Sequence, residues 1–322
     1  MTKNPILSII IPTYDRYSLL KKCIQSIVNA SSPGISIEII VVDDGGNLNR
    51  DIETEFPANR IQWIYLPENK GQAHAQHVGF QHSSGNIIAF LDDDLQIDHH
   101  WITEIVRFFA THSDIHCIVG KIESADNSHI LARTRQVIYD HRHQQYCEPG
   151  FTDHVKNKWN LSIKSNVFLC ERISAGNFAV RRQVLETSGI CKTRNIFAND
   201  EIMSQNLLQA GYAIAYHPDM IIYHHHDTKF RTLYKIGCRK MTQNCKDVRN
   251  INLTLLFRLL KNICCSPTDF FRHREMFQAD KSRVKVYVAF TLLRFFYSFG
   301  ELISFIKIYI RSKFKFIGIF YQ

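Results

Sequence analysis

The sequence lacks an uninterrupted apolar stretch long enough to cross a membrane. Its most apolar segment, residues 286–310, is broken by Arg294 and Glu301. The longest uncharged stretch in that segment is Val286–Leu293, whereas a spanning helix needs about 20 apolar residues. We therefore expect no transmembrane helix here.

Paired cysteine motifs are also absent, and we expect no secretory leader. The nine cysteines are scattered, and none of them forms a C-x-x-C pair. Neither a zinc ribbon nor a disulfide framework is indicated, and reduced thiols in the cytosol are the simplest interpretation. The first apolar run, Ile6–Ile11, stops at Pro12 and is too short for a signal peptide.

Acidic residues are scarce in the last third of the chain. Residues 1–226 contain 20 Lys+Arg against 24 Asp+Glu, a balance of −4, whereas residues 227–322 contain 19 against 6, a balance of +13. Such a basic region indicates an anionic partner, either phospholipid or nucleic acid. The apolar segment places its polar residues Thr291, Arg294 and Ser298 on one helical face, which favours an amphipathic helix at a lipid surface over nucleic-acid binding. A helix pair packed on the catalytic domain is the alternative.

The first hundred residues alternate between predicted strands and helices. With 45% hydrophobic and 21% charged residues, the chain has the composition of a globular protein. Apolar runs and helical periodicity predict, in order, a strand at Leu7–Ile11, a helix at Tyr17–Ala30, a strand at Ile37–Val42, a strand at Gln62–Leu66, a helix at Gln72–Gln81 and a strand at Asn86–Leu91. This alternation predicts an α/β fold with a Rossmann-like half and a mixed, mostly parallel sheet.

Residues 125–170 are polar and lack apolar runs, and we expect them to form a long irregular excursion. Regular structure is expected to return afterwards, first at Arg181–Ser188, then as a helix at Asp200–Ala210, followed by strands at Ala213–Tyr216 and Met220–Tyr223. The predicted domains are therefore residues 1–226, in two halves of about 1–100 and 101–226, and a basic helical region at 227–322.

Three consecutive aspartates are the most informative motif. Asp92, Asp93 and Asp94 directly follow the apolar run Ile87–Leu91. The carboxyl ends of strands are where open α/β sheets bind ligands. Clustered carboxylates at such an edge suit Mg²⁺ or Mn²⁺ carrying a substrate's phosphates, although a solvated acidic loop is the alternative.

Several further motifs follow one another in a recognisable order. They are Ile10-Ile11-Pro12-Thr13-Tyr14, Asp43-Asp44-Gly45-Gly46, Asn69-Lys70-Gly71, Ala75-Gln76-His77-Val78-Gly79, Asp92-Asp93-Asp94, Gly176-Asn177, Asn199-Asp200-Glu201 and His224. With this ordered set, residues 5–226 resemble the family 2 glycosyltransferases, which have the A-type glycosyltransferase fold.

The resemblance implies a set of residues that bind a nucleotide-diphosphate sugar, with UDP as the expected nucleotide. Asp94 and Asp92 would hold Mn²⁺ or Mg²⁺, and Asp92 would also face the hydroxyls of the ribose or sugar. The remaining donor-binding residues would be Pro12, Thr13, Tyr14, Asp43, Asp44, Asn69, Gly71 and Asp93. For Asp43 and Asp44, a helix cap with a turn glycine is the alternative role.

Asp200 matches the acidic residue that acts as general base in the family. It would take a proton from the acceptor hydroxyl, so that one in-line displacement inverts the anomeric centre. A helix cap is the alternative, and the two roles are compatible. His224 or His226, just after a predicted strand, would complete the metal shell or contact the diphosphate, the alternative being a polar strand end.

The resemblance implies a metal-dependent inverting enzyme that glycosylates a glycan or lipid-linked acceptor in cell-surface polysaccharide or glycolipid synthesis. We expect it in the cytoplasm, peripheral on the inner face of the membrane, with no nucleic-acid partner. Gln76-His77 and Asn199 depart from the family pattern and leave open a non-catalytic sugar-nucleotide-binding or scaffolding member. A nucleotidyltransferase is disfavoured, because Pro12–Arg16 is not a glycine-rich basic phosphate loop.

Overall fold

The computed structural model describes residues 6–31, 34–47, 50–56, 61–126, 130–174, 176–187, 200–225 and 301–303. The chain divides into two compact units, residues 1–125 with 142–225 and residues 126–141 with 226–322. Asn199, His226 and nearly all of the basic region 227–322 lie outside the described residues, so the predictions made for them stay predictions.

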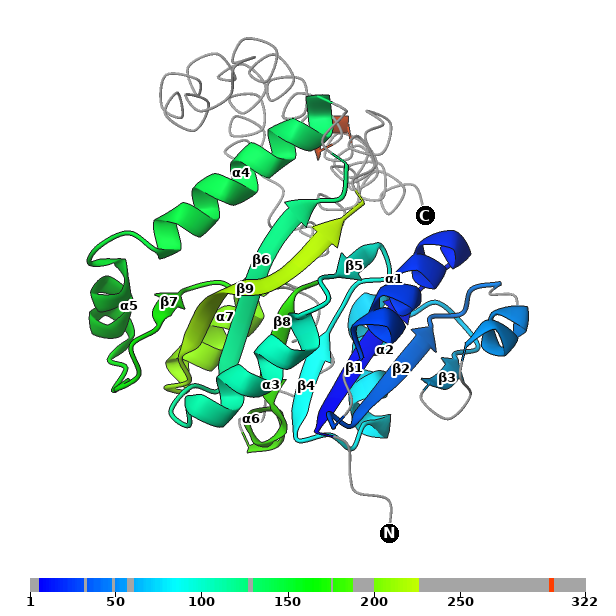
Figure 1. The fold of residues 1–322 in the computed structure, drawn as a ribbon, viewed down its shortest axis with the longest axis horizontal. Coiled ribbons are helices and arrows are strands. Elements are labelled where there is room, and N and C mark those ends of the chain that lie inside the picture. Colours follow the sequence, from blue (N-terminus) through cyan, green and yellow to red (C-terminus); the bar gives the residue numbers. More distant parts are fainter. Residues whose placement is uncertain are drawn as a thin grey trace, which may run out of the picture. The chain divides into compact units, whose positions relative to one another are not determined.

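Strands and helices alternate along the chain (Figure 1). In order, the elements are β1 (Leu7–Thr13), α1 (Tyr17–Ala30), β2 (Ile37–Asp43), the 3₁₀ helix η1 (Arg50–Glu55), β3 (Ile61–Tyr65), α2 (Gln72–His82), β4 (Ile87–Phe90), β5 (Leu95–Ile97), α3 (Trp101–Thr111), β6 (Cys117–Ser124), α4 (Ile130–Tyr146), α5 (Phe151–Trp159), β7 (Phe168–Cys170), β8 (Phe178–Arg181), α6 (Arg182–Thr187), α7 (Asp200–Gln209) and β9 (Ile214–His224).

The described strands form one mixed sheet in the order β3-β2-β1-β4-β8-β6-β9-β5, with β7 added beside β9. The first four strands are parallel, and β8 is antiparallel to both β4 and β6. In Figure 1 the parallel half carries the blue and cyan strands, and the mixed half carries the green and yellow ones. The predicted α/β fold with a Rossmann-like half is confirmed.

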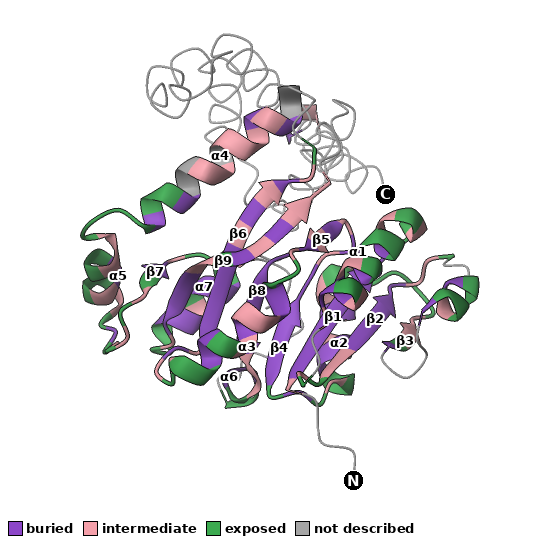
Figure 2. Cartoon of the chain, in the orientation of Figure 1, coloured by how far each residue is buried: buried purple, intermediate pink, exposed green. Residues whose placement is uncertain are grey.

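The core lies around the central strand β1. All seven residues of β1 are buried, because the strand has a neighbour on each side and helices above and below (Figure 2). The strand is rich in isoleucine, whose branched side chain suits a sheet that is covered on both faces. Helix α1 packs with an apolar stripe that includes Leu20, Ile24 and Ile27, all fully buried and spaced three or four residues apart.

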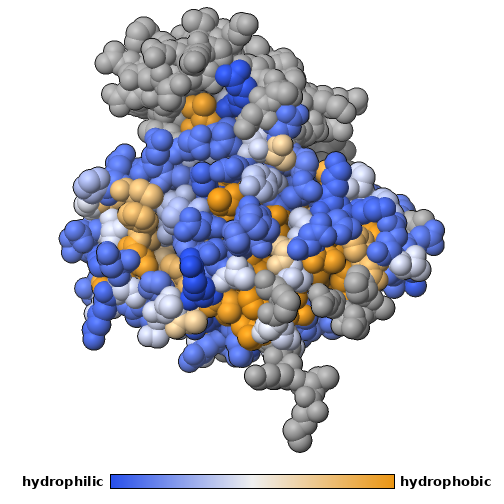
Figure 3. All heavy atoms as spheres, viewed as in Figure 1, coloured by the Kyte–Doolittle hydropathy of each residue, from blue (hydrophilic) through white to orange (hydrophobic). Residues whose placement is uncertain are grey.

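The outer surface carries few large apolar side chains among the described residues. The viewed face is mostly hydrophilic, with apolar residues showing between the polar ones (Figure 3). The exposed large hydrophobic side chains are Tyr14, Phe168 and Ile202. Single exposed side chains of this kind are normal for a folded protein.

The prediction of an irregular excursion at residues 125–170 was wrong, because the segment contains helices α4 and α5. The absence of long apolar runs was misleading. Helix α4 is built from Ala, Arg and Gln, which have good helix propensity, and the Gln136 side chain donates to Asp140 Oδ1 one turn later at 2.7 Å. The two strands predicted at 213–223 are one continuous strand, β9.

None of the described helices is long and apolar enough to cross a membrane. The apolar segment 286–310 lies outside the described residues except for 301–303.

Candidate functional site

Three strand ends meet at one edge of the sheet. Strands β2, β1 and β4 are neighbours and run parallel, so the residues that follow each strand lie on the same side. They are Asp43 at the end of β2 with Asp44 after it, Thr13 at the end of β1 with Tyr14 to Arg16 after it, and the aspartate triplet after β4. The sequence predicted this meeting, because carboxyl ends of parallel strands share an edge.

Asp93 points into the protein and not toward solvent. Its side chain is fully buried, accepts a hydrogen bond from Thr13 Oγ1 at 2.7 Å, and pairs with Arg16 at 2.7 Å. Burial raises the pKa of Asp93 to about 6, against the lowering effect of Arg16 and Thr13. In this structure Asp93 and Thr13 therefore fasten β4 to β1.

Asp94 lies beside two basic side chains. Its Oδ2 accepts a hydrogen bond from Arg16 Nη1 at 2.9 Å and lies 3.7 Å from His224 Nε2. Burial tends to raise the pKa of Asp94, but the hydrogen bond and charge of His224 together with the charge of Arg16 outweigh it and hold that pKa below its usual value. The carboxylate is therefore kept ionised beside an imidazole.

Asp92 has neighbours from both halves of the catalytic unit. Its Oδ1 accepts from Gln72 Nε2 at 2.6 Å. Burial raises the pKa of Asp92 to about 7, helped by the negative charges of Asp94, Asp93 and Asp200. A β-carbon on Gly176 would lie only 3.0 Å from Asp92 Oδ2, so glycine leaves room for this carboxylate.

Asp200 is the first residue of α7, and its charge acts on Asp92. One side chain of the helix, Ser204, holds its start in place. Ser204 Oγ donates to the Asp200 carbonyl and accepts from the backbone N–H of Ile173, which lies outside the helix, at 2.9 Å. An acidic residue at a helix N-terminus also suits the helix dipole. The predicted base and the predicted metal-binding carboxylates therefore belong to one electrostatic cluster.

Asp43 and Asp44 are buried and already accept hydrogen bonds from backbone N–H groups. Asp43 Oδ1 accepts from Gly46 at 3.0 Å, while the two oxygens of Asp44 accept from Lys70 at 3.0 Å and Gly71 at 2.7 Å. These bonds join the loop after β2 to the loop before α2. The two aspartates therefore hold together the loops at the edge where nucleotide binding is predicted.

Gly45 makes this approach possible. Its φ is +73°, and an added β-carbon would lie 2.3 Å from the Glu68 carbonyl carbon, so no side chain fits. Of the other predicted donor-binding residues, Pro12 is buried within β1, whereas Tyr14 and Asn69 are exposed. The predicted donor-binding set thus divides into buried supporting residues and exposed ones.

Sequence reasoning missed two residues, Arg16 and Gln72. Arg16 pairs with both Asp93 and Asp94, and Gln72 donates to Asp92. Both follow loops at the edge where the strands end, a position from which they could have been proposed. What the sequence did not reveal was which carboxylate each of them would reach.

A second group of potential metal ligands lies apart from the triplet. Glu104, His217 and Asp219 offer ligand atoms within 4.8 Å of one another. Glu104 already pairs with His217 at 2.9 Å and with Arg107. These internal pairs account for the cluster without a metal.

Comparison with known proteins assigns the sequence to a family. The family model described as "Glycosyl transferase family 2" matches residues 8–186, more than half of the chain. The chain belongs to glycosyl transferase family 2. The matched region contains the edge where β1, β2 and β4 end, so the predicted glycosyltransferase class is confirmed.

Two sequence relatives illustrate the match. The chain is 25% identical to glycosyltransferase AglE of Haloferax volcanii over 220 residues, covering 67% of this chain and 66% of AglE. It is 29% identical to N-acetylgalactosaminyltransferase 6 of Drosophila melanogaster over 114 residues, covering 33% of this chain and 17% of the relative. The chain thus spans just under two thirds of AglE and less than a fifth of the other protein.

A solved structure extends the likeness in fold. The mannosyltransferase PcManGT of Pyrobaculum calidifontis superposes with a TM-score of 0.55 at 15% identity, over 97% of this chain and 89% of that protein. GalNAc-T7 superposes with a TM-score of 0.52 at 14% identity, over 69% of this chain and 43% of that one. At these identities the likeness concerns the fold alone.

Proposed function

We propose that the protein transfers a sugar from a nucleotide-diphosphate donor, UDP-linked in the first instance, to a hydroxyl of an acceptor, with inversion at the anomeric carbon. One observation carries the proposal. Asp94 Oδ2 and His224 Nε2 lie 3.7 Å apart at the edge of the sheet, and the charge of Asp200 acts on the neighbouring Asp92. These contacts support a donor site with an acceptor-side base nearby.

Two structural neighbours support the donor class. PcManGT was solved with GDP-mannose and Mn²⁺, and GalNAc-T7 with UDP, N-acetylgalactosamine and Mn²⁺. These ligands belong to those proteins. By similarity of fold, they favour a nucleotide-linked donor and a divalent cation for this chain as well.

The residues present fit a divalent cation. Asp94 Oδ2 and His224 Nε2 lie 3.7 Å apart, and Asp92 adds a carboxylate whose pKa is raised by burial and by the neighbouring negative charges. Oxygen ligands with one imidazole suit Mn²⁺, and oxygen ligands suit Mg²⁺. When bound, the cation would act as a Lewis acid that stabilises negative charge on the diphosphate leaving group.

The protein's own groups perform the remaining steps. Asp200 accepts the proton of the acceptor hydroxyl while that oxygen attacks the anomeric carbon. Asp92 orients the donor by accepting hydrogen bonds from its hydroxyls. Arg16 and His224 keep Asp94 ionised and in place. One displacement from the face opposite the leaving group gives inversion.

We also propose that residues 227–322 dock the enzyme on an anionic cytoplasmic membrane face, where it would glycosylate a glycan or lipid-linked acceptor. The support is the +13 balance of that region in the sequence. Cell-surface polysaccharide or glycolipid synthesis would be the setting.

A donor-hydrolysis screen tests the enzymatic proposal. UDP-, GDP- and dTDP-sugars are incubated with the protein in Mn²⁺, Mg²⁺ or EDTA, and the released nucleoside diphosphate is measured. We expect release from one nucleotide class only, and only with a divalent cation. Donor binding without turnover toward any acceptor, together with an Asp200→Asn variant that behaves like wild type, would instead identify a non-catalytic member.

A further inference from the structure

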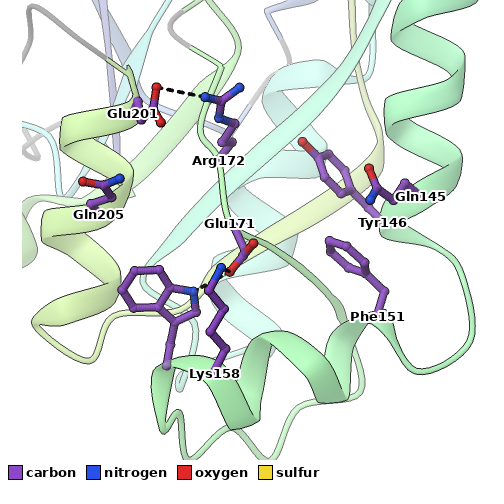
Figure 4. A pocket seen from close by; sticks show the side chains of 9 residues that line it. Gln145, Tyr146, Phe151, Lys158, Glu171, Arg172, Glu201 and Gln205 are labelled. Carbon is purple, nitrogen blue, oxygen red and sulfur yellow. Dashed lines mark hydrogen bonds and ion pairs between the residues drawn. The ribbon is translucent and has the colours of Figure 1, made fainter. Parts of the chain in front are cut away.

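A pocket of about 340 Å³ lies in the second half of the catalytic unit, beyond Asp200. Its walls come from the end of α4, from α5, from the two residues that follow β7, and from α7 (Figure 4). In Figure 4, Glu201 and Gln205 on α7 face Gln145 and Tyr146 across the opening. None of the aspartates of the triplet lines it.

Two chain segments run from this pocket to the predicted reaction centre. On α7, Glu201 lines the pocket and the preceding residue, Asp200, acts on Asp92. After β7, Arg172 lines the pocket, and Gly176 lies against Asp92 Oδ2. A ligand in the pocket would therefore lie next to the residue that we propose as the base.

The aromatic side chains of the pocket are held in fixed positions. Tyr146 packs against Phe151, with ring centroids 5.8 Å apart, and against Tyr216 at 5.3 Å. Trp159 donates its indole N–H to Glu171 Oε1 at 2.6 Å. Rigid, flat apolar faces of this kind match the C–H face of a sugar ring and lose little entropy on binding.

The charged side chains of the pocket balance one another. Lys158 pairs with Glu171 at 2.8 Å, and Arg172 pairs with Glu201 at 3.0 Å. A site for a phosphate or diphosphate would need an excess of positive charge. Paired charges and amides instead offer both donors and acceptors at short range, which is what several hydroxyl groups require.

We propose that this pocket binds an uncharged sugar unit of the acceptor, and that it makes the acceptor a neutral saccharide chain and not a bare lipid diphosphate. The inference rests on the proposed sugar transfer and names the acceptor class for it. Trp159 and Phe151 contact the ring, while Gln145 and Gln205 bind its hydroxyls. Bound there, the sugar presents its hydroxyl toward Asp200.

Binding of saccharides to the full chain tests the proposal without turnover. An array of neutral hexose and N-acetylhexosamine oligosaccharides is probed first, and affinities of the ligands found are then measured by calorimetry. Geranyl diphosphate serves as the charged probe. We expect binding of neutral saccharides that geranyl diphosphate does not displace.

Matched variants locate the binding. Gln205→Ala should weaken saccharide binding about 2- to 10-fold, the effect of losing one hydrogen bond. Gln209→Ala, the same change one turn later on the same exposed helix, should leave it unchanged. Trp159→Ala should weaken it by about 5- to 10-fold or more, and Trp159→Phe, which keeps an aromatic face, should lose less.

The outcomes separate this inference from the proposed function. No neutral saccharide bound, displacement by geranyl diphosphate, or equal affinities for Gln205→Ala and Gln209→Ala would each overturn the pocket assignment. Metal-dependent donor hydrolysis is measured in parallel. Its absence would refute the proposed transfer, whereas normal hydrolysis without saccharide binding refutes the acceptor pocket alone.

Discussion

Arg16 Nη1 donates a hydrogen bond to Asp94 Oδ2 at 2.9 Å and thereby joins the end of β1 to the end of β4. The other nitrogen of the guanidinium lies 2.7 Å from Asp93 Oδ1. Asp93 is fully buried, and Asp94 faces the predicted metal site. One arginine thus pairs with two adjacent carboxylates.

Replacing Arg16 with methionine should destabilise the protein by about 1–3 kcal/mol, because a buried carboxylate loses a charged partner. The free energy of unfolding measured in urea checks this. Lys21→Met removes the exposed Lys21–Glu55 pair and should have little effect. Equal destabilisation by both changes would mean that Arg16 contributes no more than a surface charge.

Asp94→Asn should abolish the thermal stabilisation that Mn²⁺ gives and lower sugar transfer at least about 10²-fold, since a coordinating charge is lost. The melting temperature with and without Mn²⁺ and the initial transfer rate are the measurements. Asp153→Asn makes the same change on the exposed surface of α5 and should behave like wild type. Mn²⁺ stabilisation that persists in Asp94→Asn would exclude this residue as a ligand.

Asp200→Asn should lower kcat by at least about 10²-fold while the donor Kd stays near its wild-type value. The reason is that Asp200 is proposed to act on the acceptor hydroxyl and not on the nucleotide. Single-turnover kinetics and calorimetric donor titration separate the two quantities. A collapse of donor binding together with turnover would place Asp200 in the donor site.

Without a divalent cation, stability should fall as the pH rises from about 5 to 8. The pKa values of Asp92 and Asp93 are raised to about 7 and about 6 in the folded protein, so between pH 4 and 7 the folded state binds more protons than the unfolded one. The lowered pKa of Asp94 has the opposite effect, but only under more acidic conditions.

Melting temperatures in EDTA across that range measure the effect. Asp92→Asn removes the group with the higher pKa and should flatten the dependence, most of all near pH 7. A wild-type slope that Asp92→Asn leaves unaltered would show that other groups cause it.

Full-length protein should co-sediment with liposomes that contain anionic lipid and be partly released by high salt, because each basic residue near such a surface contributes about 1 kcal/mol. Truncation after residue 280 should abolish the binding. Resistance to carbonate extraction would indicate a spanning helix, and a lack of binding to any liposome would favour helices packed on the catalytic domain.

The sequence predicted the parallel half of the fold and the meeting of the strand ends, because regular alternation leaves few arrangements for β1, β2 and β4. It did not reveal that Asp93 is buried against Thr13, because Asp93 and Asp94 lie in a turn, where side chains follow no regular alternation. Nor did it reveal helix α4, whose polar residues form a helix by propensity and local pairing and not by an apolar stripe.

The pocket was beyond reach of the sequence for a different reason. Three of its residues, Tyr146, Trp159 and Gln205, belong to three separate helices, and Arg172 lies in the loop after β7. No spacing along the chain connects them, and only tertiary packing brings them together.

Strand β9 ends at His224 and His225 follows it directly, so the register of the strand decides which of the two imidazoles lies beside Asp94. His224 Nε2 lies 3.7 Å from Asp94 Oδ2, whereas the His225 ring turns to Gln96 Oε1 at 2.6 Å. The register between β6 and β9 shifts after Gly120, where the Asn177 side chain donates to Met220 O at 3.0 Å.

Through this hydrogen bond, Asn177 helps to fix which histidine lies beside Asp94. A shift of β9 by one residue after Met220 would place His225 where His224 now lies, although the sequence would be unchanged. The choice between the two histidines is therefore made at Met220, which lies four residues before His224 and whose carbonyl accepts a hydrogen bond from the fully buried side chain of Asn177. We therefore expect that inserting or deleting one residue between Met220 and His224 moves His224 away from Asp94, although no residue in between touches a substrate.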